Sequence, residues 1–188
     1  AGPDGVFGNS DDLTWTDKTD TSGNYLFTSL PAGDYTVDVD QADMPGSSVT
    51  TTDPYNLTMS AGQINLAADF GLRGASSIGD LVWYDLDADT VKDATETGIS
   101  GVTVNLTWAG LDATFGTIDD ISWTTTTTAG GAYDFTNLPS GNFTVDVDET
   151  TAPLGMVLST TDPLSVSVAS SVDYNDADFG LTGSVSIG

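Results

Sequence analysis

The chain contains neither cysteine nor histidine among its 188 residues. Disulfide bonds, thiol nucleophiles and the usual zinc sites are therefore excluded, and no histidine can serve as an acid or base. No apolar run is long enough to span a bilayer, and no signal peptide is visible. No stretch shows a convincing helical period, so the core must be built from strands.

Basic residues are almost missing as well, with three Lys or Arg against 28 Asp or Glu and a formal net charge of −25. A chain without a basic patch cannot neutralise phosphate, which excludes nucleic acid as a partner and disfavours anionic membrane surfaces. Only Glu96 and Glu149 are glutamate, so the remaining acids are aspartate. Aspartate suits turns and metal loops because its short side chain reaches nearby backbone or a cation. Salt adaptation is an alternative origin for part of this charge.

The most regularly spaced acids lie between Asp85 and Glu96. They occupy positions 1, 3, 5, 9 and 12 of a twelve-residue segment, which is the ligand spacing of an EF-hand type calcium loop. Position 7 of such a loop adds a backbone carbonyl, so the predicted Ca²⁺ ligands are Asp85, Asp87, Asp89, Val91, Asp93 and Glu96. Position 6, where the sharp turn prefers glycine, is Thr90, which lowers the expected affinity. The alternative is a solvated acidic turn. Bound calcium would also relieve the self-repulsion of so acidic a chain.

Internal repetition organises the whole chain. Residues 25–33 (YLFTSLPAG) return as residues 133–141 (YDFTNLPSG), and residues 69–72 (DFGL) return as residues 178–181. The offset is 108 residues for the first pair and 109 for the second, so one residue is inserted between them. The sequence therefore predicts three pieces: residues 1–75 as a first repeat lacking its opening strands and first calcium loop, residues 76–183 as a complete second repeat, and residues 184–188 as the start of a third.

We expect such a chain to be an excerpt from a longer array. The join between the repeats, residues 72–77, is short and contains no extended Gly/Ser or Pro-rich tract. A flexible linker would need more, so consecutive repeats are expected to hold a defined orientation and to form a rod.

The second repeat contains several short strands separated by turn signals. Residues 102–107 and 143–148 alternate apolar and polar side chains, as half-buried strands do. This pattern predicts an all-β fold of tandem antiparallel Ig-like or prealbumin-like β-sandwich repeats, each of about 109 residues. Aromatic residues at equivalent positions are predicted to lie mostly in the core: Trp15 and Trp123, Phe27 and Phe135, and Phe70 and Phe179.

Four segments of the second repeat carry a resemblance to a known family: residues 78–85 (IGDLVWYD), 96–99 (ETGI), 131–135 (GAYDF) and 138–141 (LPSG). Together they resemble the B-type repeats of serine–aspartate-repeat surface adhesins, the SdrD B-like family within the wider Cna-B-like group. The resemblance covers nearly the whole chain. It implies a calcium-binding β-sandwich that is exported and strung in tandem as a stalk or spacer on a microbial surface.

A second acidic loop covers residues 109–120. By the same resemblance it is predicted to hold another ion through Asp112, Asp119 and Asp120, with Asp4, Asp11 and Asp12 as the equivalents in the first repeat. Its spacing fits no strict ligand template, unlike that of residues 85–96.

These observations favour a structural protein: an extracellular or cell-surface segment of a stalk, fibre or filament that calcium rigidifies. Its expected partners are neighbouring repeats of the same protein, with self-association into filaments as an extension. The alternative is an adhesin module that binds a host or matrix protein or a glycan directly through an exposed patch. A glycoside-cleaving enzyme that uses paired carboxylates is disfavoured, because the acids follow cation-ligand spacing and no His or Cys accompanies them.

Overall fold

The computed structural model describes residues 1–20, 22–43 and 47–183. The chain divides into two compact units with the boundary between Leu72 and Arg73. The predicted start of a third repeat, residues 184–188, lies outside the described residues. Apart from two short 3₁₀ turns, Gln41–Asp43 and Glu149–Thr151, the regular structure in the described part is β-strand, so the predicted all-β class is confirmed.

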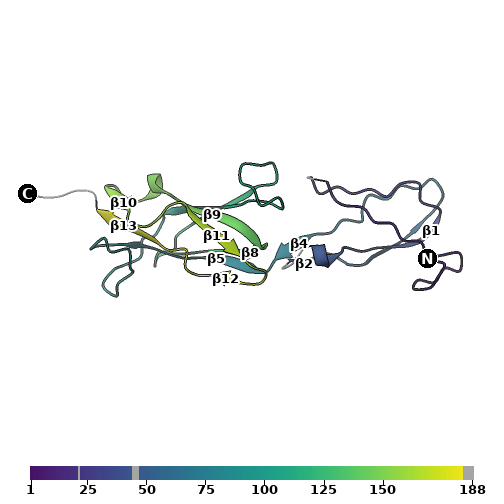
Figure 1. Cartoon of the computed structure of the whole chain (residues 1–188), viewed down its shortest axis with the longest axis horizontal. Coiled ribbons are helices and arrows are strands. Elements are labelled where there is room, and N and C mark those ends of the chain that lie inside the picture. The colour runs from purple at the N-terminus through teal and green to yellow at the C-terminus, as the bar shows by residue number, and fades with distance from the viewer. Residues whose placement is uncertain (21, 44–46, 184–188) are drawn as a thin grey trace, which may run out of the picture. The chain divides into compact units, whose positions relative to one another are not determined.

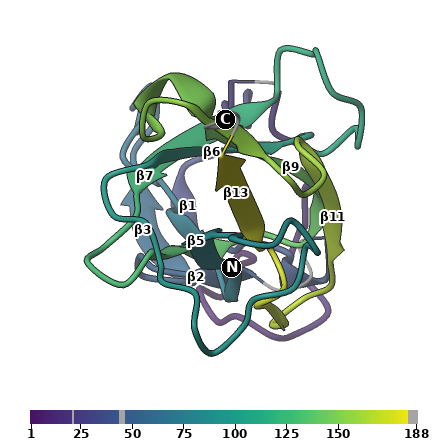
Figure 2. The same cartoon turned by 90° about the vertical axis from the view of Figure 1, so that its left-hand side faces the viewer.

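The second unit contains nine strands (Figure 1). They are β5 (Ser76–Tyr84), β6 (Thr103–Trp108), β7 (Ile121–Thr126), β8 (Ala132–Leu138), β9 (Gly141–Asp148), β10 (Met156–Leu158), β11 (Leu164–Val168), β12 (Asp173–Tyr174) and β13 (Phe179–Gly183). One sheet has the antiparallel order β11-β9-β6-β7, with β6 paired to β9 on one side and to β7 on the other. Figure 2 shows the strands of this unit from the side of the molecule at which β13 lies.

The other sheet is built around β5. Its antiparallel partner is β8, and its other edge pairs first with β12 and then with β13. The last two pairings are parallel, which the expected antiparallel sandwich did not include. The difference arises because the repeat's first and last strands are neighbours that run in the same direction. β10 then pairs with β13 and completes this sheet.

Alternation of side chains places the core between the two sheets. On β6 and β9 every second residue is buried, namely Val104, Leu106, Phe143, Val145 and Val147. β5 contributes Ile78 and Val82, and β13 contributes Phe179 and Leu181, all with no exposed surface. Each fully buried side chain of this size stabilises the fold by roughly 1.5–3 kcal/mol. The predicted core positions Phe135 and Phe179 are confirmed, while Trp123 is only partly buried against the cluster.

The first unit has four strands: β1 (Gly33–Val37), β2 (Ser47–Val49), β3 (Tyr55–Met59) and β4 (Leu72–Gly74), the last of which reaches the boundary. β1 pairs with β3, and β2 pairs with β4. None of the described residues between 1 and 72 is buried. The expectation that Trp15 is a core residue is therefore wrong, since 43% of its surface is exposed. Its counterpart Trp123 is partly buried, because it packs against the core cluster of the second unit.

Candidate metal centre

The acidic loop of residues 85–96 begins where β5 ends, and backbone hydrogen bonds fix both of its ends. The Tyr84 N–H donates to the Thr97 carbonyl at 2.9 Å, and the Asp85 N–H donates to the Leu181 carbonyl of β13 at 2.9 Å. Two residues further out, the Ile99 N–H donates to the Val82 carbonyl at 2.8 Å. The loop is therefore closed at its base by the sheet itself, which limits the positions its carboxylates can take.

Asp85 is the buried anchor of this loop, with no exposed surface. Its Oδ1 accepts from the Asp89 N–H at 3.2 Å and its Oδ2 accepts from the Thr90 N–H at 3.1 Å. Burial alone would raise the pKa of Asp85, but hydrogen bonds that include the N–H groups of Thr90 and Asp89 outweigh it and lower that pKa. Asp85 is thus held as a buried anion.

Three carboxylates converge at the start of the loop. Single oxygens of Asp85, Asp87 and Asp89 lie within 4.8 Å of one another, a spacing that suits ligands of one ion. Asp87 has a raised pKa, caused first by desolvation and then by repulsion from neighbouring acids that include Asp89, Glu96 and Asp93. Repulsion among neighbouring carboxylates is expected in a site whose acids surround a cation.

Glu96 closes the loop from its far end. It is 6% exposed, its Oε1 accepts from the Leu86 N–H at 2.6 Å, and its Oε2 accepts from the Asp93 N–H at 3.0 Å. Both oxygens point into the loop, although neither belongs to the converging group of three. Asp93 and Val91 lie on the exposed side, and the Val91 N–H donates to Asp89 at 2.8 Å. The structure thus brings together the carboxylates of the first three predicted ligands and leaves those of Asp93 and Glu96 outside that group, while the predicted role of the Val91 carbonyl stays a prediction.

Two features of the loop depart from a simple acidic turn. Thr90, at the position that prefers glycine, has a φ of +69°, so the sharp left-handed turn is formed despite the side chain. Lys92, the loop's basic residue, donates from Nζ to the Asp93 and Glu96 carbonyls. The Lys92 charge therefore sits among the acids, where it offsets part of their repulsion.

The second acidic loop uses its carboxylates to bind its own backbone. Asp119 Oδ2 accepts from the Leu111 N–H at 2.7 Å, Asp120 Oδ2 accepts from the Gly116 N–H at 2.6 Å, and Asp112 Oδ1 accepts from the Thr114 N–H at 2.8 Å. A hydrogen bond from the Thr117 hydroxyl is the main cause of the lowered pKa of Asp119. Within the described residues these three acids do not form a converging group, and their role as ion ligands stays a prediction.

The first unit repeats this arrangement. Asp12 accepts from the Gly8 N–H at 2.6 Å and from the Gly2 N–H at 3.0 Å, and Asp4 accepts from the Val6 N–H at 2.9 Å. The Gly8 contact is the main cause of the lowered pKa of Asp12. Asp11, half-buried beside them, is also not gathered with Asp4 and Asp12 into a group of ligand spacing.

A further group of acids, which the ligand spacing did not single out, consists of Asp178, directly before β13, with Asp80 and Asp176. The Asp178 Oδ1 is buried and has no hydrogen-bond partner among the described residues. Burial and, secondarily, the charge of Asp80 raise the pKa of Asp178 to about 6. Next to it the Tyr133 hydroxyl donates to the Ala177 carbonyl at 2.5 Å. Asp178 lies between the buried residues Ala177 and Phe179 and is itself only half-buried, so spacing along the sequence provided no signal for it.

The sequence profile of the SdrD B-like domain matches residues 76–185, more than half of the chain. This chain belongs to the SdrD B-like family. Its matched segment runs from the first residue of β5 past the last residue of β13, so it contains both sheets and the loop of residues 85–96. No helix among the described residues is long and apolar enough to cross a membrane.

Two curated relatives of this SdrD B-like chain come from Staphylococcus aureus. Serine-aspartate repeat-containing protein E of strain MSSA476 is 32% identical over 178 residues, and serine-aspartate repeat-containing protein D of strain Newman is 32% identical over 179 residues. Each alignment covers 88% of this chain but only 14% and 12% of the respective relative. The chain therefore corresponds to a small part of proteins of this kind.

Solved pilin structures show a weaker similarity. The minor pilin GBS52 of Streptococcus agalactiae is 14% identical, with a TM-score of 0.45 over 90% of this chain and 68% of that chain. The major pilin SpaD of Corynebacterium diphtheriae is 19% identical, with a TM-score of 0.39 over 59% and 32%. Scores of this size carry no argument about function.

Proposed function

We propose that this chain is a calcium-rigidified segment of an extracellular or cell-surface stalk, fibre or filament. A surface location follows from its membership of the SdrD B-like family. One observation carries the calcium part of the proposal: oxygens of Asp85, Asp87 and Asp89 converge within 4.8 Å at the end of β5. Their oxygens are the hard ligands that Ca²⁺ prefers, and Glu96 is long enough to complete the site.

The residues of the loop would act by tying the ends of strands together. Asp85 is bonded through its N–H to Leu181 of β13, and Glu96 spans the loop from Leu86 to Asp93. Bound calcium would supply positive charge at the point where these acids repel one another. Fixing the loop would then hold β5 and β13, the repeat's first and last strands, in one arrangement.

The acids of the second loop, Asp112, Asp119 and Asp120, and their equivalents Asp4, Asp11 and Asp12, are proposed as weaker ion sites. Their hydrogen bonds already preform the loop, so an ion would have to use the lone pairs that remain. The proposed partners of the chain are neighbouring repeats of the same protein and, in an assembled filament, further copies of it. The named curated relatives are serine-aspartate repeat-containing proteins, and the role proposed for this chain is structural and not enzymatic.

Thermal melting tests the calcium part of the proposal. The two glutamates provide a matched pair: Glu96 lies in the loop, whereas Glu149 lies exposed in a 3₁₀ turn. The full chain, Glu96→Ala and Glu149→Ala are melted in calcium, in magnesium and in chelator. A ligand that binds only the folded state raises the melting temperature with its concentration. We expect calcium to raise it for the unmodified chain and Glu149→Ala, and much less for Glu96→Ala.

Magnesium separates site binding from charge screening, because it has the same charge but requires a smaller octahedral site. Equal melting temperatures in calcium and chelator would reject the calcium site. An equal effect of calcium on both variants would reject Glu96 as a ligand.

A further inference from the structure

One edge of the four-stranded sheet in the second unit has no neighbouring strand. β7 pairs with β6 without a shift in register, from Thr126 with Thr103 to Ile121 with Trp108. On its other side β7 has no hydrogen-bonded strand among the described residues, and Figure 2 shows β7 and β11 on opposite sides of β6 and β9. Alternate backbone groups of an antiparallel strand point to opposite sides. Half of the N–H and C=O groups of β7 therefore face away from the sheet and can accept a further strand.

β7 also lacks the features that usually prevent an edge strand from pairing with another chain. Such edges are commonly blocked by a charged side chain, a proline, a bulge or a covering segment. Residues 121–126 (ISWTTT) contain neither a charge nor a proline, and their ladder with β6 is unbroken. Ile121 is 46% exposed, and Thr124 and Thr126 are exposed as well, which argues against a cover. β-branched and aromatic residues of this kind favour the extended conformation.

The other edge strands described in the second unit are short or protected. β8 carries the exposed Asp134, and its ladder with β5 contains a register shift. β10 and β12 have only three and two residues. β11 begins directly after Asp162 and Pro163. Among these edges, β7 is therefore the one that offers a long and unprotected ladder.

The sheet surface beside β7 carries no charge, although the chain has a net charge of −25. The residues of β6 and β7 that alternate with the inward-facing ones are Thr103, Asn105, Thr107, Ser122, Thr124 and Thr126. The Thr124 hydroxyl donates to Asn105 Oδ1 at 3.0 Å, which orders part of this polar surface. An uncharged surface of this kind is where two copies of an acidic chain can approach most closely.

The nearest acids on the same face of the sheet lie on β9. Asp146 pairs with Asn105 and Asp148 pairs with Thr103, so β6 separates both acids from β7. Two strand spacings amount to about 9.6 Å. This separation is close to the screening length of about 10 Å at 0.1 M salt. A second copy at β7 would therefore not bring carboxylates directly against these acids.

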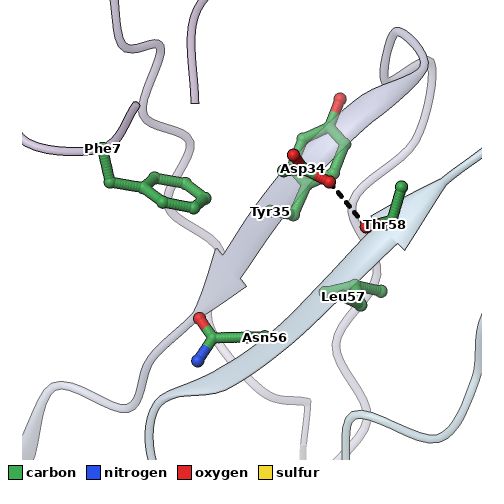
Figure 3. Close-up of a pocket in the computed structure, with 6 residues that line it drawn as sticks. All are labelled: Phe7, Asp34, Tyr35, Asn56, Leu57 and Thr58. Atoms are coloured by element: carbon green, nitrogen blue, oxygen red, sulfur yellow. Dashed lines mark hydrogen bonds between the residues drawn. The ribbon is translucent and has the colours of Figure 1, made fainter. Parts of the chain in front are cut away.

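The opposite edge of the sheet is less suitable, because acids lie directly beside it. β9, which carries Asp146 and Asp148, is the immediate neighbour of β11. The first unit has an acid in a similar place on the counterparts of these strands: Thr58 of β3 donates to Asp34 of β1 at 2.5 Å (Figure 3). A chain added at β11 would thus meet carboxylates only one strand spacing away.

We propose that β7 is a self-association edge, at which β7 of one copy pairs antiparallel with β7 of a second copy. The two four-stranded sheets then form one continuous sheet. The inference rests on the structural function proposed above and names the surface through which copies join, and it does not depend on calcium.

An identical strand fits this edge because the pairing is self-complementary. Side chains opposite each other in a ladder point to the same face, so outward residues must meet outward residues. A two-fold axis at Thr124 meets this condition, since it sets Thr124 opposite Thr124 and Ser122 opposite Thr126 of the second copy. Hydroxyl side chains at these positions can then pair across the new ladder.

The antiparallel direction follows from Asp119 and Asp120, which directly precede β7. In a parallel pair these acids of the two copies would lie side by side and repel one another. In the antiparallel pair they lie at opposite ends of the new ladder, with the two Asp120 residues roughly 27 Å apart along it.

Sedimentation equilibrium of the full chain at increasing protein concentration tests the proposal, at low and at high sodium chloride. We expect a dimer that becomes more populated with concentration and with salt, because salt screens the charge that each copy carries. Thr124→Asp should raise the dissociation constant by about tenfold or more, because it places two carboxylates opposite each other. Thr124→Asn, which has the same shape without the charge, should raise it much less.

Two further measurements locate the contact. Ser165→Asp adds the same charge at an exposed position of β11 and should leave the dissociation constant nearly unchanged. A mixture of Thr124→Asp with Thr124→Lys should associate more tightly than either variant alone, because opposite charges then meet at the axis. Residue 124 is exposed, so all these variants are expected to melt like the unmodified chain.

Absence of a dimer at high salt would overturn the proposal. An equal effect of Ser165→Asp, or a mixture that associates no better than its components, would overturn it too, because the contact would then lie elsewhere. Repeating the experiment in calcium and in chelator, with melting curves, separates this inference from the proposed function. A calcium effect on melting without a dimer would reject the inference alone, and a dimer with no calcium effect on melting would reject the calcium site alone.

Discussion

At the scale of single residues, Thr90 is a strained point of the loop of residues 85–96. A β-branched residue with a φ of +69° is a steric outlier, and such strain costs on the order of 1–3 kcal/mol. Thr90→Gly should remove this strain and so stabilise the folded chain. The greater freedom of glycine in the unfolded chain offsets part of this gain. We expect the variant to melt higher in chelator and to bind calcium more tightly.

Calcium titration by calorimetry and melting in chelator measure these two effects of Thr90→Gly. Thr95→Gly is the control, since Thr95 is an exposed residue of the same loop that is not among those with positive φ. Weaker calcium binding by Thr90→Gly than by the unmodified chain would show that the threonine contributes to the site.

Asp178 should make stability depend on pH in a defined direction. Its pKa in the folded chain is about 6, above the value of about 3.9 for an unperturbed aspartate, so the folded state holds this proton more tightly. The favourable contribution of the protonated group is complete below about pH 4 and is lost as pH rises through 6. Asp178→Asn should therefore raise the melting temperature near pH 7 and have little effect near pH 4.

Melting curves of the Asp178→Asn variant across this pH range make the comparison, with Asp146→Asn as the control for removing one negative charge. Asp80 and Asp176 repel the ionised Asp178, so their charges act in the same direction. If Asp178→Asn instead lowered the melting temperature near pH 7, the Asp178 carboxylate would have a stabilising partner.

The convergence of Asp85, Asp87 and Asp89 was predictable at the residue scale because the three carboxylates lie within one loop. Carboxylates at every second position from Asp85 to Asp89 curl toward one point once the loop ends are fixed. Asp178 could not be found in the same way. Its raised pKa comes mainly from burial, with repulsion from Asp80 nearly a hundred residues earlier in the chain, and spacing along the sequence does not report either.

At the scale of secondary structure, β6 is one of the two inner strands of its sheet and should contribute strongly to the stability of the second unit. Leu106 on this strand has no exposed surface and pairs with Val145 on one side and Trp123 on the other. Leu106→Ala should lower the free energy of unfolding by about 2–5 kcal/mol through lost burial and a cavity.

Leu111→Ala is the matched control for Leu106→Ala, because the Leu111 side chain is 83% exposed in the second acidic loop. It should change the free energy of unfolding by about 0.5 kcal/mol or less. Denaturant unfolding of both variants gives the two values. If the two variants lost similar amounts of unfolding free energy, the inner position of β6 would be contradicted.

Strands such as β6, β9 and β11 were readable from alternation, because one face of each is core and the other is solvated. The parallel pairing of β5 with β12 and β13 was not, since it depends on which distant strands meet. Equally, residues 24–30 resemble β8 in sequence without forming a strand, because a strand needs a ladder partner as well as a pattern.

At the scale of the whole molecule, the net charge of −25 should make stability depend on ionic strength when calcium is removed. Salt screens repulsion over about 10 Å at 0.1 M and about 3 Å at 1 M. We therefore expect the melting temperature in chelator to rise with sodium chloride. The rise should be smaller in calcium, where the loop acids are already neutralised.

Melting in a sodium chloride series, with and without calcium, tests this expectation. Potassium chloride serves as the control, because screening depends on ionic strength and not on which monovalent cation is used. If salt left the melting temperature in chelator unchanged, the acids would be too far apart, or too well paired with backbone N–H groups, to repel one another.

The parallel contact between β5 and β13 determines how the second unit would respond to tension. β5 is its first strand and β13 its last, and they meet through the pairs Val82 with Phe179, Trp83 with Gly180 and Tyr84 with Leu181. A pull on the two ends of this unit draws the two strands past each other lengthwise. The hydrogen bonds between them are then loaded in shear and must break together, instead of opening one at a time as in a zipper.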